Sequence, residues 1–369
     1  YLDKLNGWDA YNDIIETYRK LYCEWGGKIY GFVQDGDVAQ LYYRKDVFGN
    51  AEFRDKFKSK YGYEMEVPPK TFDKMLDIAE FFTGWDWNGD GKKDYGFIPF
   101  NIAKPALEGM FLPVFGAASG GKPLFDEDVH PLINSPAGVR TLKIINRMKE
   151  LSPPGILALG WGETLTAFIE GQVPMTLWYP DIGRLILSPE SWGGTGGPHW
   201  KGKIGYAVWP GEIVEGKLVQ YTSMSHGRIM GVTKFSKNPE AAAAAIIEMQ
   251  KPERSILNTS NLASGSDPYA KSMLDISRWT IPVEKEFIET HLECMKYGYP
   301  DIEMPGTEEY YDTLRTQVSG YLAGEKSAEA ALKALETEWE KITDKRGRAK
   351  QKEAWAVFLG MLREIGFKI

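Results

Sequence analysis

Two carboxylates lie two residues apart in the segment Gly27–Phe48, directly before a strand-like run. In an extended segment the side chains of Asp35 and Asp37 would project to the same side. An ionised carboxylate accepts hydrogen bonds from neighbouring hydroxyl groups, so this pair could hold a polyhydroxylated ligand. A solvated surface loop is the alternative, because Asp is common in turns. Asp35 and Asp37 are therefore the strongest polar candidates for a binding site.

Aromatic residues make up 13% of the chain and include 12 tryptophans. Flat apolar ring faces suit the C–H-rich faces of sugar rings, although most indoles in a folded protein pack in its core. Trp161 precedes a predicted helix, and Gly160 and Gly162 flank it. Because glycines leave the indole face uncovered, we expect Trp161 to be available to a ligand, with plain packing as the alternative.

The segment Asp86–Asp94 has the residue pattern of a calcium loop. Oxygen-bearing side chains stand at positions 1, 3, 5 and 9, and Gly91 stands at position 6, where such a loop turns sharply. Phe97 replaces the usual glutamate at position 12, so a site here would be weak, with a Kd of about 10⁻⁴–10⁻³ M. An Asx-turn loop without metal is the alternative. The candidate ligands are Asp86, Asn88, Asp90, Lys92 and Asp94.

Composition argues against several other classes of protein. The net charge is −7, from 44 basic and 51 acidic residues, and no basic block appears, so nucleic acid is not an expected partner. No apolar run approaches the roughly 18 residues of a membrane-spanning helix. The four histidines are not spaced for zinc, and no Gly-x-Ser-x-Gly motif is present. A length of 369 residues favours two domains.

The candidate residues need a scaffold, and the sequence predicts strands that alternate with helices, which is typical of α/β domains. Helices are expected at residues 9–22, 72–82, 137–151, 164–169, 239–249, 310–321 and 328–342, and strands at 28–33, 39–43, 95–99, 173–179, 203–209 and 229–233. Thr71 can cap the second of these helices. Because an α/β domain normally begins with a strand, we expect a further segment before the first helix.

Five segments in order resemble the extracellular solute-binding proteins of family 1, the maltose-binding-protein-like receptors of ABC sugar importers. These segments are Gly27–Phe48, Val67–Asp73, Phe168–Trp178, Lys234–Ala242 and Gly320–Leu332. They span nearly the whole chain. The family's first strand and helix are absent, and residues after about Gly347 extend beyond the usual end.

The resemblance implies a two-lobed, periplasmic-binding-protein-like (type II) α/β fold whose hinge-linked lobes close on a ligand. Lobe one would comprise residues 1–100 and 232–300, with its N-terminal part missing. Lobe two would comprise 105–228 and 307–369. The hinge crossings would lie near 100–105, 228–232 and 300–306.

The resemblance also implies roles for individual residues. The family has an acidic, hydroxyl-binding residue at the position of Asp37 and a stacking tryptophan at the position of Trp178. Tyr179 and Asp181 follow directly and would lie beside the ligand. A core position is the alternative for Trp178.

Four further candidates follow from the same mapping. Phe115 would lie near the crossing between the lobes, and Tyr311, after Tyr310, matches an aromatic position that can face the cleft. Plain packing is the alternative for both. His226 and Arg228 fall where the chain crosses back to lobe one. The Arg228 guanidinium would suit an acidic sugar, and an ion pair between the lobes is its alternative.

Taken together, these patterns predict a receptor rather than an enzyme: it would bind a mono- or oligosaccharide or a polyol and dock on the membrane permease of an ABC importer. No cofactor is required beyond the candidate Ca²⁺, and a monomer is expected. The expected location is periplasmic or extracellular, with a lipid anchor left open. Two alternatives remain: a glycoside hydrolase in which Asp35 or Asp37 pairs with Glu163, and a carbohydrate-binding or protein-interaction module.

Overall fold

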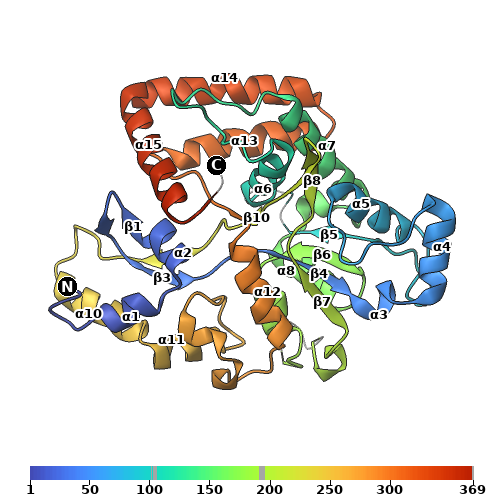
Figure 1. Ribbon diagram of the computed structural model, residues 1–369, viewed down its shortest axis with the longest axis horizontal. Coiled ribbons are helices and arrows are strands. Elements are labelled where there is room, and N and C mark those ends of the chain that lie inside the picture. Colours follow the sequence, from blue (N-terminus) through green and yellow to red (C-terminus); the bar gives the residue numbers. More distant parts are fainter. Residues whose placement is uncertain (101, 103–105, 191–195, 368–369) are drawn as a thin grey trace.

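The chain forms two lobes of unequal size, and the strand β3 leads from the smaller lobe into β4 of the larger one (Figure 1). The computed structural model describes residues 1–100, 102, 106–190 and 196–367. The smaller lobe carries β1, β3, α1, α10 and α11, at the left of Figure 1. The larger lobe carries the main sheet and the C-terminal helices α13 and α14.

Helices and strands are interspersed along the chain, mostly as short runs of one kind followed by runs of the other, rather than in the strict alternation predicted. The α-helices are Trp8–Asp13 (α1), Glu16–Tyr18 (α2), Lys45–Phe48 (α3), Ala51–Tyr61 (α4), Phe72–Phe81 (α5), Glu108–Ala118 (α6), Pro136–Glu150 (α7), Trp161–Ile169 (α8), Asp181–Leu185 (α9), Pro239–Met249 (α10), Pro252–Thr259 (α11), Lys285–Met295 (α12), Thr307–Leu322 (α13), Ala328–Arg346 (α14) and Arg348–Glu364 (α15). The strands are Glu24–Trp25 (β1), Lys28–Ile29 (β2), Phe32–Asp35 (β3), Gln40–Arg44 (β4), Ile98–Pro99 (β5), Met175–Trp178 (β6), Ile204–Ala207 (β7), Gly211–Val214 (β8), Lys217–Gln220 (β9), Thr222–Ser223 (β10), Arg228–Met230 (β11) and Gly298–Tyr299 (β12).

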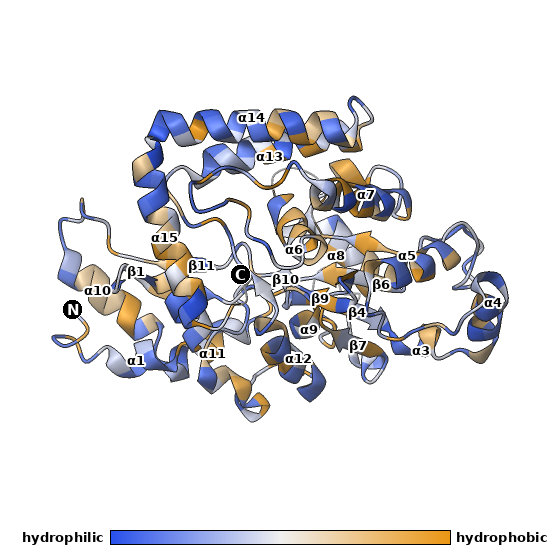
Figure 2. Cartoon of the chain, turned by 45° about the horizontal axis from the view of Figure 1, so that its top comes forward, coloured by the Kyte–Doolittle hydropathy of each residue, from blue (hydrophilic) through white to orange (hydrophobic). Residues whose placement is uncertain are grey.

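The main sheet has four strands in the order β5-β6-β4-β7. β4 is antiparallel to β6 and β7, whereas β5 is parallel to β6. Helices α7 and α8 contact β5, and α12 contacts β4 and β7. All four residues of β6 are buried, as expected for a strand enclosed by its neighbours. Figure 2 shows the contrast with α4 and α14, which lie outside and are largely hydrophilic.

The main sheet contains strands from both of the predicted lobes. β4 and β5 fall in the predicted 1–100 segment of lobe one, yet they are hydrogen-bonded within the sheet that contains β6 and β7 of predicted lobe two. Most of the predicted crossing at 100–105 lies outside the described residues. The boundaries of the two lobes stay a prediction.

Three chain segments run side by side between the two lobes. The Ala39 N–H donates to the Ser223 carbonyl at 2.8 Å, and the Met224 N–H donates to the Tyr299 carbonyl at 3.1 Å. β10 and β12 are parallel to each other. Because these bonds tie the segments together, a relative movement of the lobes must be absorbed at their ends.

The structure follows the predicted helices closely where a capping residue or a proline marks the start. The Thr71 side chain accepts a hydrogen bond from the Lys74 N–H at the start of α5, and α10 spans Pro239–Met249. The predicted helix at residues 9–22 is instead broken into α1, α2 and a π-helix. Ile14 and Ile15 are extended, because Ile14 forms a β-bridge with Ala270. None of the described helices is both long enough and apolar enough to span a membrane.

Candidate functional site

A cavity of about 320 Å³ gathers most of the binding residues predicted from the sequence. It is lined by Asp35, Asp37, Trp161, Leu165, Trp178, Asp181, His226, Arg228 and Gly265. Seven of the ten predicted residues are in this set, and Phe115, Tyr179 and Tyr311 are not. The fold places these seven side chains around one space. The role of all ten residues in ligand binding stays a prediction.

Strand ends and helix starts position these side chains. Asp35 ends β3 and pairs across the antiparallel ladder with Arg228, the first residue of β11. Trp178 ends β6, and Asp181 begins α9 after a three-residue step. Trp161 begins α8, so its indole stands at the helix N-terminus. The cavity therefore collects residues from four separate parts of the sequence, between Asp35 and Gly265.

Asp35 is held in an ion pair at one side of the cavity. Its Oδ2 lies 2.5 Å from Nη2 of Arg228, and its Oδ1 accepts the Asp267 N–H at 2.6 Å. Burial raises the pKa of Asp35 to about 6, although Arg228 and the Asp267 amide oppose this rise. Arg228 also donates to the Gly265 carbonyl. This ion pair joins neighbouring residues of the β3–β11 ladder and is not the predicted pair between the lobes, and contact of Arg228 with a ligand stays a prediction.

A second, deeper ion pair lies behind the cavity. Arg184 is completely buried, and its guanidinium contacts Oδ1 of Asp267 and Oδ1 of Asp181, each at 3.1 Å. It also donates to the Ser264 carbonyl at 2.7 Å. A buried guanidinium needs such partners to offset its lost hydration. Arg184 therefore fixes the positions of two carboxylates at the site.

Asp37 differs from these carboxylates, because no ion pair to it occurs among the described residues. Burial, together with the charges of Asp35, Asp267 and Asp181, raises the pKa of Asp37 well above its ordinary value. Oxygens of Asp35, Asp37 and Asp267 lie within 4.8 Å of one another, which is a spacing that could hold a cation.

The aromatic wall consists of Trp161, Trp178 and the supporting ring of Tyr179. Trp161 stacks on Tyr179 with the ring centroids 5.8 Å apart and 22° between the planes. Trp161 and Trp178 meet edge to face at 5.9 Å. Trp161 is 38% exposed, whereas Trp178 is 1% exposed. The structure therefore offers Trp161 as the accessible face, while the largely buried Trp178 contributes to the cavity wall.

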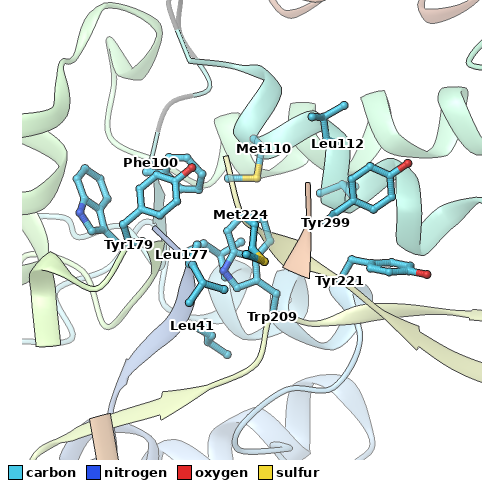
Figure 3. Close-up of a cluster of buried hydrophobic side chains, with 14 of the residues drawn as sticks. Leu41, Phe100, Met110, Leu112, Leu177, Tyr179, Trp209, Tyr221, Met224 and Tyr299 are labelled. Carbon is cyan, nitrogen blue, oxygen red and sulfur yellow. The ribbon is translucent and has the colours of Figure 1, made fainter. Parts of the chain in front are cut away.

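Tyr179 belongs to the cluster of buried hydrophobic side chains shown in Figure 3, and it supports Trp161 from below. Its ring lies 4.7 Å from the ring of Phe100, and its hydroxyl is 3.0 Å from Oγ of Ser223. The residue does not line the cavity. It connects the aromatic wall to β10 and so to the segments that run between the lobes.

His226 adopts a left-handed backbone conformation with φ +76°, which is uncommon for a residue other than glycine. Its N–H points to Oδ2 of Asp301 at 3.4 Å, and its ring meets those of Trp161 and Tyr179 edge to face. Nε2 has no hydrogen-bond partner among the described residues, although Oε1 of the buried Glu108 lies 4.0 Å from it. A ligand in the cavity could supply one.

The two remaining aromatic candidates lie elsewhere. Phe115 is 1% exposed and stacks on Phe111 at 6.0 Å within α6, so its position is that of a packing residue. The Tyr311 hydroxyl donates to Oδ1 of Asp301 at 2.7 Å and accepts the Ile302 N–H. Tyr311 therefore supports the carboxylate that faces the backbone of His226.

The sequence analysis missed Arg184 and Asp267. Arg184 lies three residues after Asp181, a spacing that allows contact on a helix, and this was the one available signal. Asp267 stands in an irregular segment, 83 positions from Arg184. Glu163, the proposed hydrolytic partner of Asp35 or Asp37, instead bonds the Gly160 N–H at 3.0 Å and lines a separate cavity.

The predicted calcium loop is organised by its own amides. Asp86 accepts hydrogen bonds from the N–H groups of Gly89, Asp90 and Gly91, and Asp94 accepts from those of Trp87 and Asn88. Burial raises the pKa of Asp94. Among the described residues, the carboxylates of this loop do not converge on one point as those of Asp35, Asp37 and Asp267 do. Calcium binding here stays a prediction.

The chain is similar to a curated relative, the probable amino-acid ABC transporter periplasmic-binding protein y4oP of Sinorhizobium fredii. The two are 22% identical over 347 residues, which cover 92% of this chain and 70% of the relative. A likeness at 22% identity does not show that this chain binds the same ligand as the relative.

Solved structures share the fold. Maltose-bound MalE3 of T. maritima is 21% identical with a TM-score of 0.71, over 92% of this chain and 79% of that one. A solute-binding protein of Agrobacterium radiobacter K84 in complex with ribitol has the same identity and TM-score, over 92% and 78%. A solute-binding protein of Agrobacterium vitis S4 with bound D-mannitol is 20% identical with a TM-score of 0.68, over 94% and 80%.

These likenesses confirm the two-lobed fold that the sequence predicted. The model of the bacterial extracellular solute-binding proteins matches residues 1–280, which is well over half of the 369 residues. The chain therefore belongs to the bacterial extracellular solute-binding protein family.

Proposed function

We propose that this chain is the substrate-binding receptor of an ABC importer and that it binds a carbohydrate or polyol in the cavity beside Trp161. The observation that carries the proposal is the pairing of an exposed indole face with the carboxylates of Asp35 and Asp37 in one space of about 320 Å³. Apolar ring faces and hydroxyl-binding carboxylates are the two chemistries that a sugar or polyol requires. Such a volume suits a small ligand.

The relatives support the same class of ligand. The three solved structures contain maltose, ribitol and D-mannitol, all of them polyhydroxylated. The curated relative is described as an amino-acid receptor of an ABC transporter, so its ligand class differs while its transport role agrees. The cavity chemistry favours the polyhydroxylated class, because the guanidinium of Arg228 is already paired with Asp35 and is less available to a ligand carboxylate.

Binding would proceed by closure of the two lobes on the ligand. Trp161 stands in the larger lobe and would stack on an apolar ring face, while Asp35 and Arg228 come from the β3–β11 pair of the smaller lobe. A ligand that contacts both groups favours the closed arrangement, because it gains those contacts only there. The closed form is the one that a membrane permease would recognise.

A thermal-shift screen tests the proposal. The protein is heated with mono-, di- and oligosaccharides, polyols, uronic acids and amino acids, and each compound that raises the melting temperature is measured by calorimetry. A ligand at 100 times its Kd adds about 2.7 kcal/mol to the free energy of unfolding. Stabilisation by a sugar or polyol supports the proposal, whereas stabilisation by amino acids alone overturns it.

The same samples decide between a receptor and a glycoside hydrolase. Each bound sugar is recovered after incubation and analysed by mass spectrometry. Intact sugar is the expected result, since Glu163 caps α8 rather than lining the cavity with Asp35 and Asp37. Cleaved sugar would assign the chain to the hydrolases.

The further parts of the proposal concern the receptor's surroundings. We expect a monomer in the periplasm or at the cell surface, held there by a lipid anchor or free, that delivers its ligand to a membrane permease. Light scattering of the purified protein with and without ligand checks the monomer. A dimer in either sample would contradict it.

A further inference from the structure

We infer that the ligand of this cavity carries an ammonium group against Asp37, so that the preferred substrate class is an amino sugar or an aminated polyol. The inference rests on the proposed function and deepens it. Its basis is the arrangement of charges around the cavity, the aromatic wall beside them and an unpartnered indole N–H in the same wall.

The first argument is the charge balance of the site. Four carboxylates belong to it, and two guanidinium groups face them. The carboxylates are Asp35, Asp37, Asp181 and Asp267, and the guanidiniums are Arg184 and Arg228. Arg228 pairs with Asp35, and Arg184 with Asp181 and Asp267, so Asp37 is left without a cation among the described residues. A buried carboxylate either binds a proton or is paired with a positive charge.

A single organic cation fits this position better than a metal ion does. The oxygens of Asp35, Asp37 and Asp267 are close enough to bind a divalent ion. However, Nη2 of Arg228 lies 2.5 Å from Asp35, and Nε of Arg184 lies 3.1 Å from Asp267. A divalent ion would stand directly beside two guanidinium charges, which oppose it. One ammonium group balances the charge of Asp37 while carrying half the charge of a divalent ion.

The aromatic wall supplies the second argument. Trp161 and Trp178 line the same cavity as Asp37, and their rings meet edge to face at 5.9 Å. The electron-rich faces of tryptophan attract an ammonium group within about 6 Å of the ring centroid, most strongly where water is excluded. Carboxylates next to indole faces thus favour a cation over a neutral group.

The ligand must also carry hydrogen-bond acceptors. Trp178 is 1% exposed, and its Nε1–H is buried. This N–H has no acceptor in the described part of the chain. An orphaned buried donor is costly, and a ligand oxygen would satisfy it once closure of the lobes on the ligand opens a path to this atom. A simple alkylamine offers no such atom, whereas a hydroxylated amine offers both the cation and the acceptor.

Proton release provides a readout on the unmodified protein. Asp37 is surrounded by charged or titratable groups from several segments, which are Asp35, Asp181, Asp267, Tyr18, Tyr22 and Tyr179. Its pKa is raised well above the ordinary value, chiefly by burial. An arriving ammonium favours the ionised carboxylate, so binding of an amine should release protons to the extent that Asp37 is protonated without ligand.

The experiment is titration calorimetry with matched pairs. Glucosamine is compared with glucose and N-acetylglucosamine, glucamine with glucitol, and putrescine serves as an amine without hydroxyl groups. We expect each hydroxylated amine to bind at least about tenfold more tightly than its neutral counterpart. In buffers of different ionisation enthalpy, the amines should release protons and the neutral sugars should not.

Variants complete the test. Asp37→Asn should abolish the preference for the amine, while Asp128→Asn, which removes an exposed carboxylate paired with Lys352, should keep it. If Asp37→Asn does not fold, the proton release of the natural chain still decides the matter.

Each alternative outcome has a distinct meaning. Tighter binding of the neutral sugars overturns the inference and leaves the carbohydrate receptor intact. Binding of putrescine alone, of Ca²⁺ at this site, or of none of the probes overturns the inference, and putrescine alone would also overturn the carbohydrate assignment.

Discussion

Trp161 lies over Tyr179 with 22° between the ring planes, and Tyr179 itself is fully buried. Tyr179 is fixed from below by Phe100 and by the hydroxyl of Ser223. One face of Trp161 is thus supported by a rigid ring while 38% of the residue remains exposed. A supported indole loses little conformational entropy when a ligand stacks on it, which is the property of an effective binding surface.

Replacing Trp161 by alanine should weaken ligand binding by about 1 kcal/mol or more, the usual size of an aromatic stack beyond its buried area. The melting temperature without ligand should change little, since the residue is partly exposed. Trp8→Ala is the matched control, because Trp8 is 42% exposed and lies outside the cavity. Calorimetry with the sugar found in the screen measures both. Equal affinities of the two variants would remove Trp161 from the site.

Trp178→Phe tests the other indole. The change keeps an aromatic ring but removes Nε1, the donor that has no acceptor among the described residues. Without ligand, loss of an unsatisfied buried donor offsets part of the cost of placing a smaller ring in this buried position, so we expect only a modest change in stability. Ligand affinity should fall by about 1 kcal/mol if the ligand accepts from Nε1. An unchanged affinity would mean that Trp178 only packs.

Arg184→Met should destabilise the protein by about 3–5 kcal/mol, because Asp181 and Asp267 would be left buried without their cation. Methionine has a similar length but no charge. Arg254→Met is the control, since the exposed Arg254 pairs with the exposed Glu248 and should cost less than about 1 kcal/mol. Urea denaturation of both variants gives the comparison. A similar loss in both would show that the buried pair contributes no more than a surface pair.

The local parts of this site could be predicted from the sequence, but its long-range parts could not. Asp35 and Asp37 were expected on one side of an extended segment, and both line the cavity. The cap at Thr71 and the proline at the start of α10 marked helices that the structure contains. Such signals act over a few residues, so a single sequence displays them.

The features of the fold and site that could not be predicted depend on tertiary contacts. The register of β4 against β6 joins residues more than 130 positions apart, and no local pattern encodes it. The same holds for the pairing of Arg184 with Asp267. At Ile14, a bridge to Ala270 overrides an apolar spacing that alone predicts a helix. The burial of Trp178 and the exposure of Trp161 likewise depend on which neighbours the fold brings to each ring.

The stability of the protein should fall as the pH rises towards 8. Burial and the neighbouring Asp301 raise the pKa of Glu303 to about 8. A carboxyl group whose pKa is raised by folding stabilises the folded state below its unfolded pKa of 4.5, and this contribution is lost as the pH rises through about 8. Glu303→Gln should reduce the loss between pH 5 and pH 8 by about 1 kcal/mol or more. The melting temperatures of both proteins are measured from pH 5 to pH 8. An equal fall of the two melting temperatures over this range would refute the prediction.

Calcium should stabilise the loop at residues 86–94 weakly if the loop binds it. We expect the melting temperature to rise in about 10 mM CaCl₂, well above the Kd of this class of site, and to fall again with EDTA. Asp90→Ala should abolish the rise, because Asp90 offers an exposed carboxylate. The control Asp37→Asn should retain it, which separates this loop from the acidic cavity. A rise that persists in Asp90→Ala would place the ion elsewhere.

Gly36 separates Asp35 from Asp37 and leaves no room for a side chain. A Cβ atom there would lie 2.1 Å from the carbonyl oxygen of Pro268, so Gly36→Ala must displace the backbone next to Asp267. We expect a loss of about 1–3 kcal/mol in stability and a clear loss of ligand affinity. Gly360→Ala is the control, because its Cβ would meet no atom within 4 Å and alanine is favoured in the interior of α15. Urea denaturation and calorimetry measure the two effects. If Gly36→Ala kept both its denaturation midpoint and its affinity, this close approach would not be what holds the two carboxylates in place.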